Sequence, residues 1–563
     1  MIANLTPALT LIVGAFFVPL LPGRVRSAFM LLLPVVAFAH LVSLPYGTGG
    51  ELDLLNMSLV TLRVDKLSML FAIIFLIATL LGLIYALHVN DRLQHVASLL
   101  YGGSAVGAVL AGDLVTLFAF WEIAAVTSVF LVWARRTEEA YRAGMRYLLL
   151  QSVSGLLLLA GIILHFHATG SLAFGELSLD NLSGTLIFVA FGIKCAFPLL
   201  HNWLPDAYPE ATPSGTVLLS AFTTKMAVYA LARSFAGTEI LIPIGVMMTA
   251  FPIFYAVLEN DLRRVLSYSM INQIGFMVVG IGVGTELALN GAVAHAFADI
   301  IFKGLLFMSV GAVLYRTGTA KCTELGGMYK SMPWTTGFCI VGAASISAFP
   351  LFSAFVTKSM IIVAVMEEGY FWTWIMLLFA SAGVLHHAGI KIPFCAFFAQ
   401  DSGKRCQEAP LNMLVAMAIA SALCIGIGIF PGPLYSLLPY AVNYEPYTTD
   451  HVLTQLQLLM FAVLAFTAMI RHDFHPHEMD TTNLDSDWFY RKPLYWLART
   501  TSRTISQIHG KIGNAASRAV KRMAAKIEYY HGREGILARS LSTGNMAFWI
   551  TFMLAAYLLL SRL

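Results

Sequence analysis

The chain has 563 residues, of which 58% are hydrophobic and 12% are charged, and its formal net charge is +4. Soluble globular proteins carry about 25% charged residues, so the composition excludes a water-soluble protein and predicts a polytopic membrane protein. The six cysteines include no Cys-x-x-Cys pair, which argues against a metal site or a disulfide framework.

Apolar segments long enough to cross a bilayer recur along the chain. A transmembrane helix needs ~20 mostly apolar residues, and by this criterion we expect about 16 transmembrane helices in an all-α fold. They are placed at residues 3–21, 27–45, 65–88, 95–111, 113–134, 143–167, 182–203, 212–235, 238–258, 264–283, 286–316, 334–364, 371–400, 410–430, 452–471 and 543–561.

Basic residues mark alternate loops between these expected spans. Loops after odd-numbered spans carry arginine and lysine, as between Arg135 and Arg146, whereas loops after even-numbered spans are acidic or neutral, as around Glu367. The positive-inside rule therefore places the basic loops in the cytoplasm and both termini on the outer side. Two exceptions are Arg63 on the outer side and the inner loop 204–211, which has two acids and no cation.

The segment 488–542 departs from the pattern of apolar spans. It is rich in lysine and arginine, with few acids, and Ile505, Ile508 and Ile512 begin an apolar stripe at helical spacing. We expect a basic amphipathic helix along the cytoplasmic membrane surface. Two interpretations stay open: attraction to lipid headgroups alone, or a lateral strap of up to ~75 Å across a neighbouring protein of the same complex.

Few charged residues lie within the expected spans, and each is costly in hydrocarbon unless it is paired, hydrated or neutral. A lysine near a helix end can instead extend to the interface. For Lys391, His386 and His387, such snorkelling or simple polar packing is the alternative to a functional role. The candidate site residues are Glu122, Lys194, Lys225, His295, Asp299, Lys303, Lys358 and Lys391.

Spacing ties three of these residues to one helical face. His295, Asp299 and Lys303 follow one another at four-residue steps, and residues at such steps are neighbours on a helix surface. The face is either a route for protons or a locally satisfied buried ion pair. The sequence leaves both interpretations open.

Two expected helices contain an internal proline near a lysine. Pro198 follows Lys194, and Pro350 precedes Lys358, each proline within the tetrapeptide AFPL. An internal proline removes a backbone hydrogen bond and frees carbonyl groups that a cation can meet. Interrupted helices at corresponding places of two halves indicate the ion path of a repeat-built transporter.

The motifs between Val64 and Pro433 resemble those of the antiporter-like subunits shared by Mrp-type cation/proton antiporters, respiratory complex I and membrane hydrogenases. Each motif is weak alone, but all of them occur here in the family's order. They are VDKLSMLF at 64–71, LFAFWEIAAVTS at 117–128, GIKCAFPLLHNWLPDAYPEATPSG at 192–215, DLRRVLSYSMINQIGFM at 261–277, HAFADIIFKGLLFMSVGAV at 295–313 and AFPLFSAFVTKSMI at 348–361.

The resemblance implies two inverted five-helix repeats in which spans seven and twelve are interrupted. It also implies a switchable ion pair between Glu122 and Lys194, and passage of charge through Lys225 into the second half. Lys303 would then be the central proton carrier, and Lys358 the terminal one beside the outer exit. Opening or closing the ion pair would change whether Lys194 holds its proton.

The chain departs from the family pattern in three places. Asp299 stands where many relatives have a second histidine, and a carboxylate there would hold Lys303 protonated more firmly. The stretch AFPLFSAFVTK lacks the glycines that relatives usually carry, which predicts a stiffer hinge. The tail from LDSDWFYRKPLYW at 484–496 onward exceeds a plain D-type subunit of Mrp antiporters and is similar, in shortened form, to the lateral helix and anchor of the distal complex I subunit.

The expected organisation has six parts along the chain. They are the first three helices at 1–94, a first antiporter repeat at 95–235, a second repeat at 238–400, C-terminal transmembrane helices at 401–487, the basic surface helix at 488–542 and a final anchor at 543–563.

The expected function is that of the proton-translocating subunit of a multisubunit Mrp-like monovalent cation (Na+)/proton antiporter in the bacterial cytoplasmic (inner) membrane. The alternatives are an antiporter-like proton-pumping subunit of a redox-driven complex, and a membrane coupling subunit of an inorganic-carbon uptake complex. We expect other membrane subunits, membrane lipids, protons and, in the antiporter case, Na+ as partners. No nucleic acid, cofactor or metal is expected.

Overall fold

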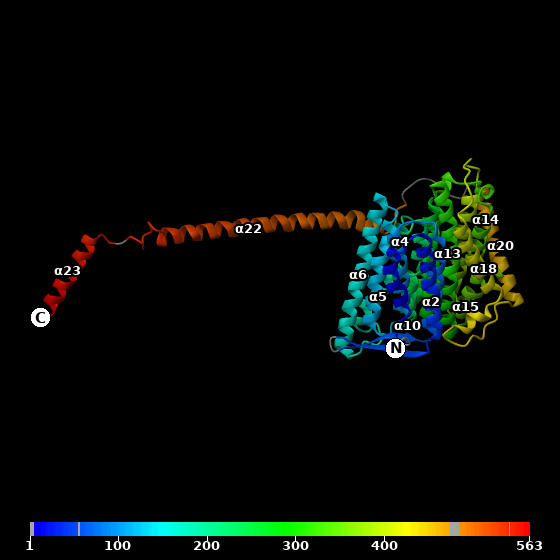
Figure 1. The fold of residues 1–563 in the computed structure, drawn as a ribbon, viewed down its shortest axis with the longest axis horizontal. Helices are drawn as coiled ribbons and strands as arrows, with labels where there is room; N and C mark the ends of the chain where they lie inside the picture. Colours follow the sequence, from blue (N-terminus) through cyan, green and yellow to red (C-terminus); the bar gives the residue numbers. More distant parts are fainter. Residues whose placement is uncertain (1–4, 55–56, 473–482, 540, 563) are drawn as a thin grey trace. The chain divides into compact units, whose positions relative to one another are not determined.

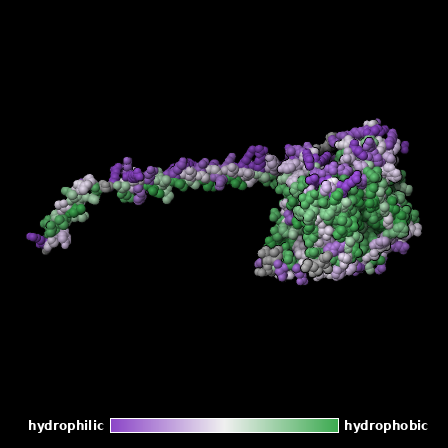
Figure 2. Space-filling model, viewed as in Figure 1, coloured by the Kyte–Doolittle hydropathy of each residue, from purple (hydrophilic) through white to green (hydrophobic). Residues whose placement is uncertain are grey.

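The computed structural model describes residues 5–54, 57–472, 483–539 and 541–562. The chain forms two units, Met1–Asn483 and Leu484–Leu563. The first unit is a bundle whose helices run side by side (Figure 1). Figure 2 shows a broad hydrophobic band across the visible face of this bundle, with hydrophilic residues gathered at its two ends. Such a band fits a protein surrounded by lipid.

Long apolar helices confirm the polytopic helical fold. Among the described residues, thirteen helices are long and apolar enough to cross a membrane. The other three expected spans correspond to a short helix, α1 (Ala8–Phe17), and to two interrupted helices, so the count of 16 stays a prediction. The long uninterrupted helices are α2 (Gly23–Ser43), α3 (Lys66–Tyr85), α4 (Arg92–Leu110), α5 (Leu114–Trp133), α6 (Glu138–Thr169), α11 (Leu241–Leu258), α12 (Leu262–Val283), α13 (Glu286–Thr317), α18 (Leu411–Ile429), α20 (Thr449–Arg471) and α23 (Thr543–Leu560).

A β-hairpin corrects the expectation of a purely α-helical chain. Strands β1 (Gly47–Leu54) and β2 (Met57–Val64) follow α2 and pair antiparallel. Val60 anchors the hairpin to the bundle, because its N–H donates to Asp113 Oδ2 at 2.9 Å and its carbonyl accepts from the Gly112 N–H at 2.9 Å. The end of the bundle that carries these strands is called the hairpin face.

Both proline-containing spans are interrupted at the AFPL tetrapeptide. Span seven divides into α7 (Leu182–Cys195) and α8 (Trp203–Ala207), and span twelve divides into α14 (Pro333–Ile346) and α15 (Ser353–Glu367). In each tetrapeptide the alanine and the leucine have positive φ, which costs an L-residue about 1–2 kcal/mol. The φ angles are 63° at Ala196, 69° at Leu199, 55° at Ala348 and 75° at Leu351.

Two other spans have irregular turns that the sequence did not predict. Span eight divides at Phe222 into α9 (Pro213–Ala221) and α10 (Thr223–Ser234). In span thirteen, α16 (Phe371–Val384) continues through the π-helical turn η5 (Leu385–Ile390). The same span ends with α17 (Lys391–Pro393) and the π-helical turn η6 (Phe394–Phe398).

The two halves of the bundle repeat the same spacing of helices and caps. Asp113 caps α5 and Asp261 caps α12, and α6 and α13 follow at the same interval with 32 residues each. Each capping aspartate also forms an isolated antiparallel bridge after the long helix, Asp113 with Ala173 and Asp261 with Lys321. The repeated spacing supports the expected duplication of one helical unit.

Arginine side chains join the loops at the end of the bundle opposite the hairpin. Arg146 binds Asp206 through two contacts of 2.7 and 2.9 Å, and Arg135 binds Glu210 at 3.0 Å. Arg263 is buried and donates to backbone carbonyls of the same 204–211 loop. The two acids of this loop therefore have cations from neighbouring loops. This end is called the arginine face.

The second unit contains the expected amphipathic helix. Helix α22 (Tyr495–His531) has 37 residues, and none of them is buried. It is preceded by α21 (Asp487–Phe489) and the π-helical turn η7 (Tyr490–Leu494), and α23 follows it as the apolar helix expected to anchor the chain. Figure 2 shows hydrophilic residues along one edge of the long helix and hydrophobic residues along the other.

Candidate functional site

Lys194 lies at the end of α7, where the AFPL break begins, and its side chain is fully buried. Its ammonium donates to the Trp121 carbonyl at 2.7 Å and lies 4.1 Å from the centroid of the Trp121 ring. The Trp121 indole donates in turn to Ser154 on α6 at 3.2 Å. Helices α5, α6 and α7 therefore hold the ammonium against a backbone carbonyl and an aromatic face.

Glu122 lies one residue beyond the group that binds Lys194. The structure does not close the expected ion pair, because within the described ranges no contact of 4 Å or less joins Glu122 to Lys194. The two charges are nevertheless close enough to interact. The half-buried carboxylate instead rests on α6, where a β-carbon added at Gly155 would collide with its Oε1 atom. The pair is therefore open in this structure.

Lys225 joins the two halves of the bundle. It lies on α10, directly after the break at Phe222, and its ammonium donates to the Ser220 carbonyl at 3.2 Å. The same ammonium forms a 2.6 Å ion pair with Asp299 Oδ2 on α13, and both side chains are fully buried. Such a pair is tolerated in a low-dielectric interior only because each charge neutralises the other.

The Lys225 contact settles which partner Asp299 takes. The four-residue spacing allowed a local pair between Asp299 and Lys303, but the carboxylate contacts Lys225 instead. Lys303 is fully buried and donates to the Ser269 hydroxyl on α12 at 2.8 Å. Asp299 therefore pairs with Lys225 from the other half of the bundle, and Lys303 donates its hydrogen bond to a neutral hydroxyl instead.

His295 lies among the buried charges of the second half, on the same helix as Lys303 and beside the helix that carries Lys358. One ring nitrogen lies 3.1 Å from the Thr357 hydroxyl on α15, and the other lies 3.1 Å from Gln273 Oε1 on α12. Lys358, also on α15, donates at 3.2 Å to the Ile346 carbonyl at the break in span twelve. Its ammonium lies 4.9 Å from the centroid of the Phe276 ring.

Among the candidate residues, Lys391 has the contacts that best fit a structural role. Its buried ammonium donates to the carbonyls of Val257 at 2.6 Å and Glu259 at 2.8 Å. These carbonyls lie at the C-terminal end of α11, where backbone acceptors lack helical partners and a cation is favourable. The geometry fits a helix cap, which is a form of the polar packing given as the alternative to a functional role.

Several polar residues of the site were not among the sequence candidates. Ser269 and Gln273 on α12 bind Lys303 and His295, and Thr357 on α15 binds His295 as well. The available signal was the run SYSMINQ, which places serine and amide side chains in a helix that is otherwise apolar. In a helix without such polar partners the buried charges would have no acceptors.

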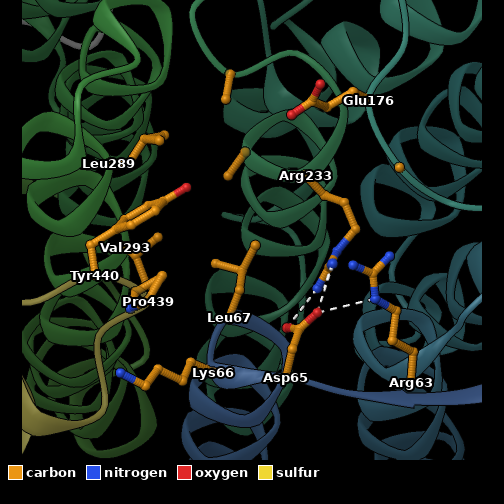
Figure 3. A pocket seen from close by; sticks show the side chains of 13 residues that line it. Arg63, Asp65, Lys66, Leu67, Glu176, Arg233, Leu289, Val293, Pro439 and Tyr440 are labelled. Atoms are coloured by element: carbon orange, nitrogen blue, oxygen red, sulfur yellow. Dashed lines mark hydrogen bonds and ion pairs between the residues drawn. The ribbon is translucent and has the colours of Figure 1, made fainter. Parts of the chain in front are cut away.

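A cavity of about 490 Å³ opens near the hairpin (Figure 3). Arg63 and Arg233 converge there on Asp65, with contacts of 3.1 and 2.8 Å. Asp65 also caps α3. Burial alone would raise the pKa of this carboxylate, but the hydrogen bond and charge of Arg233 outweigh burial and hold it below its usual value. Val293, two residues from His295, forms part of the opposite wall.

A second cavity, of about 580 Å³, lies near the arginine face. His88, Asp91 and Gln94 line it, and the Gln94 amide donates to Ser214 at 2.5 Å. Ser214 begins α9, and the other end of α9 supplies the Ser220 carbonyl that Lys225 binds. The two cavities therefore lie at opposite ends of the bundle, and charged residues form part of the lining of each.

Comparison with known proteins supports a common family. Residues 111–431, more than half of the chain, match the family described as NADH:quinone oxidoreductase/Mrp antiporter, TM. A Na(+)/H(+) antiporter subunit of Bacillus subtilis is 30% identical over 414 residues, which cover 65% of this chain and 51% of that protein. Hydrogenase-4 component B of Escherichia coli is 28% identical over 432 residues, which cover 66% of this chain and 62% of that protein.

A solved structure shares the fold over nearly the whole chain. A chain of the membrane-bound sulfane sulfur reductase, an archaeal respiratory membrane complex, superposes with a TM-score of 0.72 at 22% identity. The superposition covers 98% of this chain and 99% of that one. By contrast, the chain spans only about half to three fifths of the length of the two curated relatives.

Proposed function

Because the chain belongs to the NADH:quinone oxidoreductase/Mrp antiporter transmembrane family, we propose that it is the proton-translocating subunit of a multisubunit Mrp-like monovalent cation (Na+)/proton antiporter. The observation that carries the proposal is the buried line of titratable groups from Lys194 to Lys358. The Lys225–Asp299 pair makes this line continuous between the two halves. The Bacillus subtilis relative, which is named for Na(+)/H(+) antiport, supports cation exchange as the coupled process.

The acceptors along the line suit stepwise proton movement. Lys194, Lys303 and Lys358 each donate to a neutral oxygen, from a carbonyl or a hydroxyl. An ammonium held in this way can lose its proton without leaving an unpaired buried anion. When Glu122 and Lys194 approach each other, the electrostatic potential at Lys225 changes. The attraction between Lys225 and Asp299 changes with it.

We assign the orientation of the bundle from its loops. The arginine face carries the basic loops, so the positive-inside rule places it in the cytoplasm and places the hairpin face outside. Both termini then lie on the outer side of the bacterial inner membrane. The repeated spacing of α5–α6 and α12–α13 supports two five-span repeats, and an odd number of spans inverts the second copy relative to the first.

Partner subunits are part of the proposal. The half-buried Glu122 lies in an apolar helix, and a carboxylate facing hydrocarbon alone is unfavourable, so we place a neighbouring membrane protein of the complex beside α5 and α6. The basic helix α22 has no buried residue within its own unit. It is assigned to the lipid surface and, as a strap, to the surface of a neighbouring subunit.

Proton transport in vesicles that contain the complete complex tests this function. Glu122→Ala and Lys194→Ala should each abolish cation-dependent dissipation of a pH gradient, while the complex still assembles. Lys391→Met should reduce stability more than it reduces transport, because Lys391 caps α11. Wild-type transport by both the Glu122 and the Lys194 variants would overturn the proposal.

A redox-driven complex is the second candidate. The fold likeness to the sulfane sulfur reductase chain covers 98% of this chain, so it extends over the C-terminal unit. The hydrogenase-4 relative points the same way. Transport by the purified complex distinguishes the two: gradient-driven cation exchange without an electron donor supports the antiporter, whereas proton movement only during electron transfer supports the redox-driven complex.

A further inference from the structure

His387 is a buried histidine that the line described above does not use. It lies on the π-helical turn η5 of span thirteen, and its side chain is fully buried. Within the described ranges, neither ring nitrogen makes a hydrogen bond of normal geometry, although the Gly383 carbonyl one turn earlier acts on the ring. A buried imidazole without fixed partners is costly, and π-helical turns are frequent at functional sites.

The surroundings of His387 connect it to the central lysine. Helix α12, whose Ser269 accepts the Lys303 hydrogen bond, packs against the turn η5 that carries His387, and the charges of Lys303, His386 and Lys391 lie near enough to act on the ring. The Lys225–Asp299 pair removes the carboxylate from Lys303, which leaves that lysine on the Ser269 hydroxyl. Lys303 is therefore available to exchange a proton with a nearby base.

Span thirteen leads from His387 toward the arginine face. Lys391 follows His387 by one turn and binds the carbonyls of Val257 and Glu259 at the end of α11. That end of α11 leads directly to Asp261, the cap of α12 at the arginine face. His387 thus lies one helical turn before a side chain that reaches the arginine-face end of α11.

The π-helical turn also packs against the interruption of span twelve. Helix α14 contacts η5, and a β-carbon added at Gly389 would collide with the Ser347 hydroxyl oxygen. Ser347 follows Ile346, whose carbonyl accepts the Lys358 hydrogen bond. A change at the break in span twelve would therefore reach the turn that carries His387.

We propose that His387 is a proton-carrying residue that links Lys303 to the arginine face. This inference rests on the proposed function of the chain. An imidazole can accept a proton on one ring nitrogen and release the proton of the other. In the step proposed, one ring nitrogen of His387 takes a proton from the arginine-face side and the other ring nitrogen gives its proton to the neutral amine of Lys303, so that Lys303 becomes an ammonium and His387 is neutral again.

Transport by the assembled complex in vesicles tests this role. His387→Gln keeps a polar side chain of similar size that cannot titrate, and it should lower the initial rate of proton movement at least about tenfold with normal assembly. His386→Gln, a change of the same kind at the adjacent residue of the turn, is the matched control and should keep most of the rate. For His387→Ala, added imidazole should restore a measurable part of the rate, which a packing role alone would not allow.

A Lys303→Ala variant distinguishes failure of the His387 assignment from failure of the proposed proton-translocating function. If Lys303→Ala abolishes transport and His387→Gln retains the wild-type rate, the assignment of His387 is wrong while the proposed function stands. If Lys303→Ala itself retains transport, the proposed function fails. Equal loss in His386→Gln and His387→Gln, without imidazole rescue, would also overturn the assignment, because it would indicate a packing effect of the turn.

Discussion

Replacing Asp299 with asparagine removes one charge of the Lys225–Asp299 pair while preserving the size of the side chain. The two charged atoms are 2.6 Å apart, and both side chains are fully buried. Coulomb's law with an effective dielectric constant of about 20 gives an attraction of about 6 kcal/mol at this distance. Desolvation offsets part of that attraction, so the measurable cost of leaving Lys225 unpaired is about 3–5 kcal/mol.

A thermal-unfolding series of the assembled complex in detergent measures this effect. Asp299→Asn and Lys225→Met should each lower the unfolding midpoint clearly. The double variant should lose less than the sum of the two, because it leaves no unpaired charge in the interior. Asp401→Asn is the matched control, since Asp401 pairs with Lys330 and Arg405 at the exposed surface, where ion pairs contribute little.

Transport should follow a different pattern from stability in this series. The double variant should regain stability but not proton movement, because the connection between the two halves is then absent. The reasoning would be refuted if Asp299→Asn kept both the wild-type midpoint and the wild-type transport rate. Strictly additive shifts in the double variant would also refute it, since they would show that the two side chains do not interact.

Three further changes test other parts of the structure. Gly155→Val should displace the Glu122 carboxylate, with which an added β-carbon would collide, and should reduce transport as Glu122→Ala does. Gly337→Ala is the control, because Gly337 has open space around it, and it should leave transport unchanged. Asp65→Asn keeps a good N-cap for α3 but removes the charge that pairs with Arg233 and Arg63, and should destabilise the protein by about 1 kcal/mol near neutral pH. Because the pKa of Asp65 lies below its usual 3.8, the wild type should stay more stable than Asp65→Asn until the pH falls through that lowered pKa, where the difference should disappear. Unfolding midpoints measured across acidic pH test this. A difference that is the same at all pH values would contradict it. Deletion of residues 484–563 should weaken assembly more than it lowers transport in the complexes that remain. Co-purification of partner subunits measures assembly. A larger loss of transport than of assembly would contradict the assignment of α22 as a strap.

Local features of the sequence were sufficient to place most of the long apolar helices. Runs of ~20 apolar residues predict spans because the thickness of hydrocarbon sets their length, and the spans seen in the structure fall where such runs occur. The AFPL prolines predicted both interruptions because an internal proline removes a backbone hydrogen bond, although α2 and α11 continue through Pro34 and Pro252. The β-hairpin was missed, although Val60, Thr61 and Val64 are β-branched residues of the kind found in strands.

The contacts of the buried charges depended on the tertiary structure. The sequence singled out Lys225, Asp299 and Lys303 because charges are rare in apolar helices, but it favoured no single partner for Asp299. That choice was made by the packing of α10 against α13, which brings Lys225 to 2.6 Å from the carboxylate. In the same way, the end of α11 made Lys391 a cap.

Hydropathy, proline and charge act within a few residues of where they stand, so the sequence by itself determined the apolar helices, the two interruptions at AFPL and the identity of the buried charges. A buried charge, however, takes its partner from whichever helix packs beside it, at sequence separations that no local pattern encodes. The closed Lys225–Asp299 pair was therefore decided only when the two halves of the bundle came together, and the open Glu122–Lys194 pair only when α5, α6 and α7 packed within the first half.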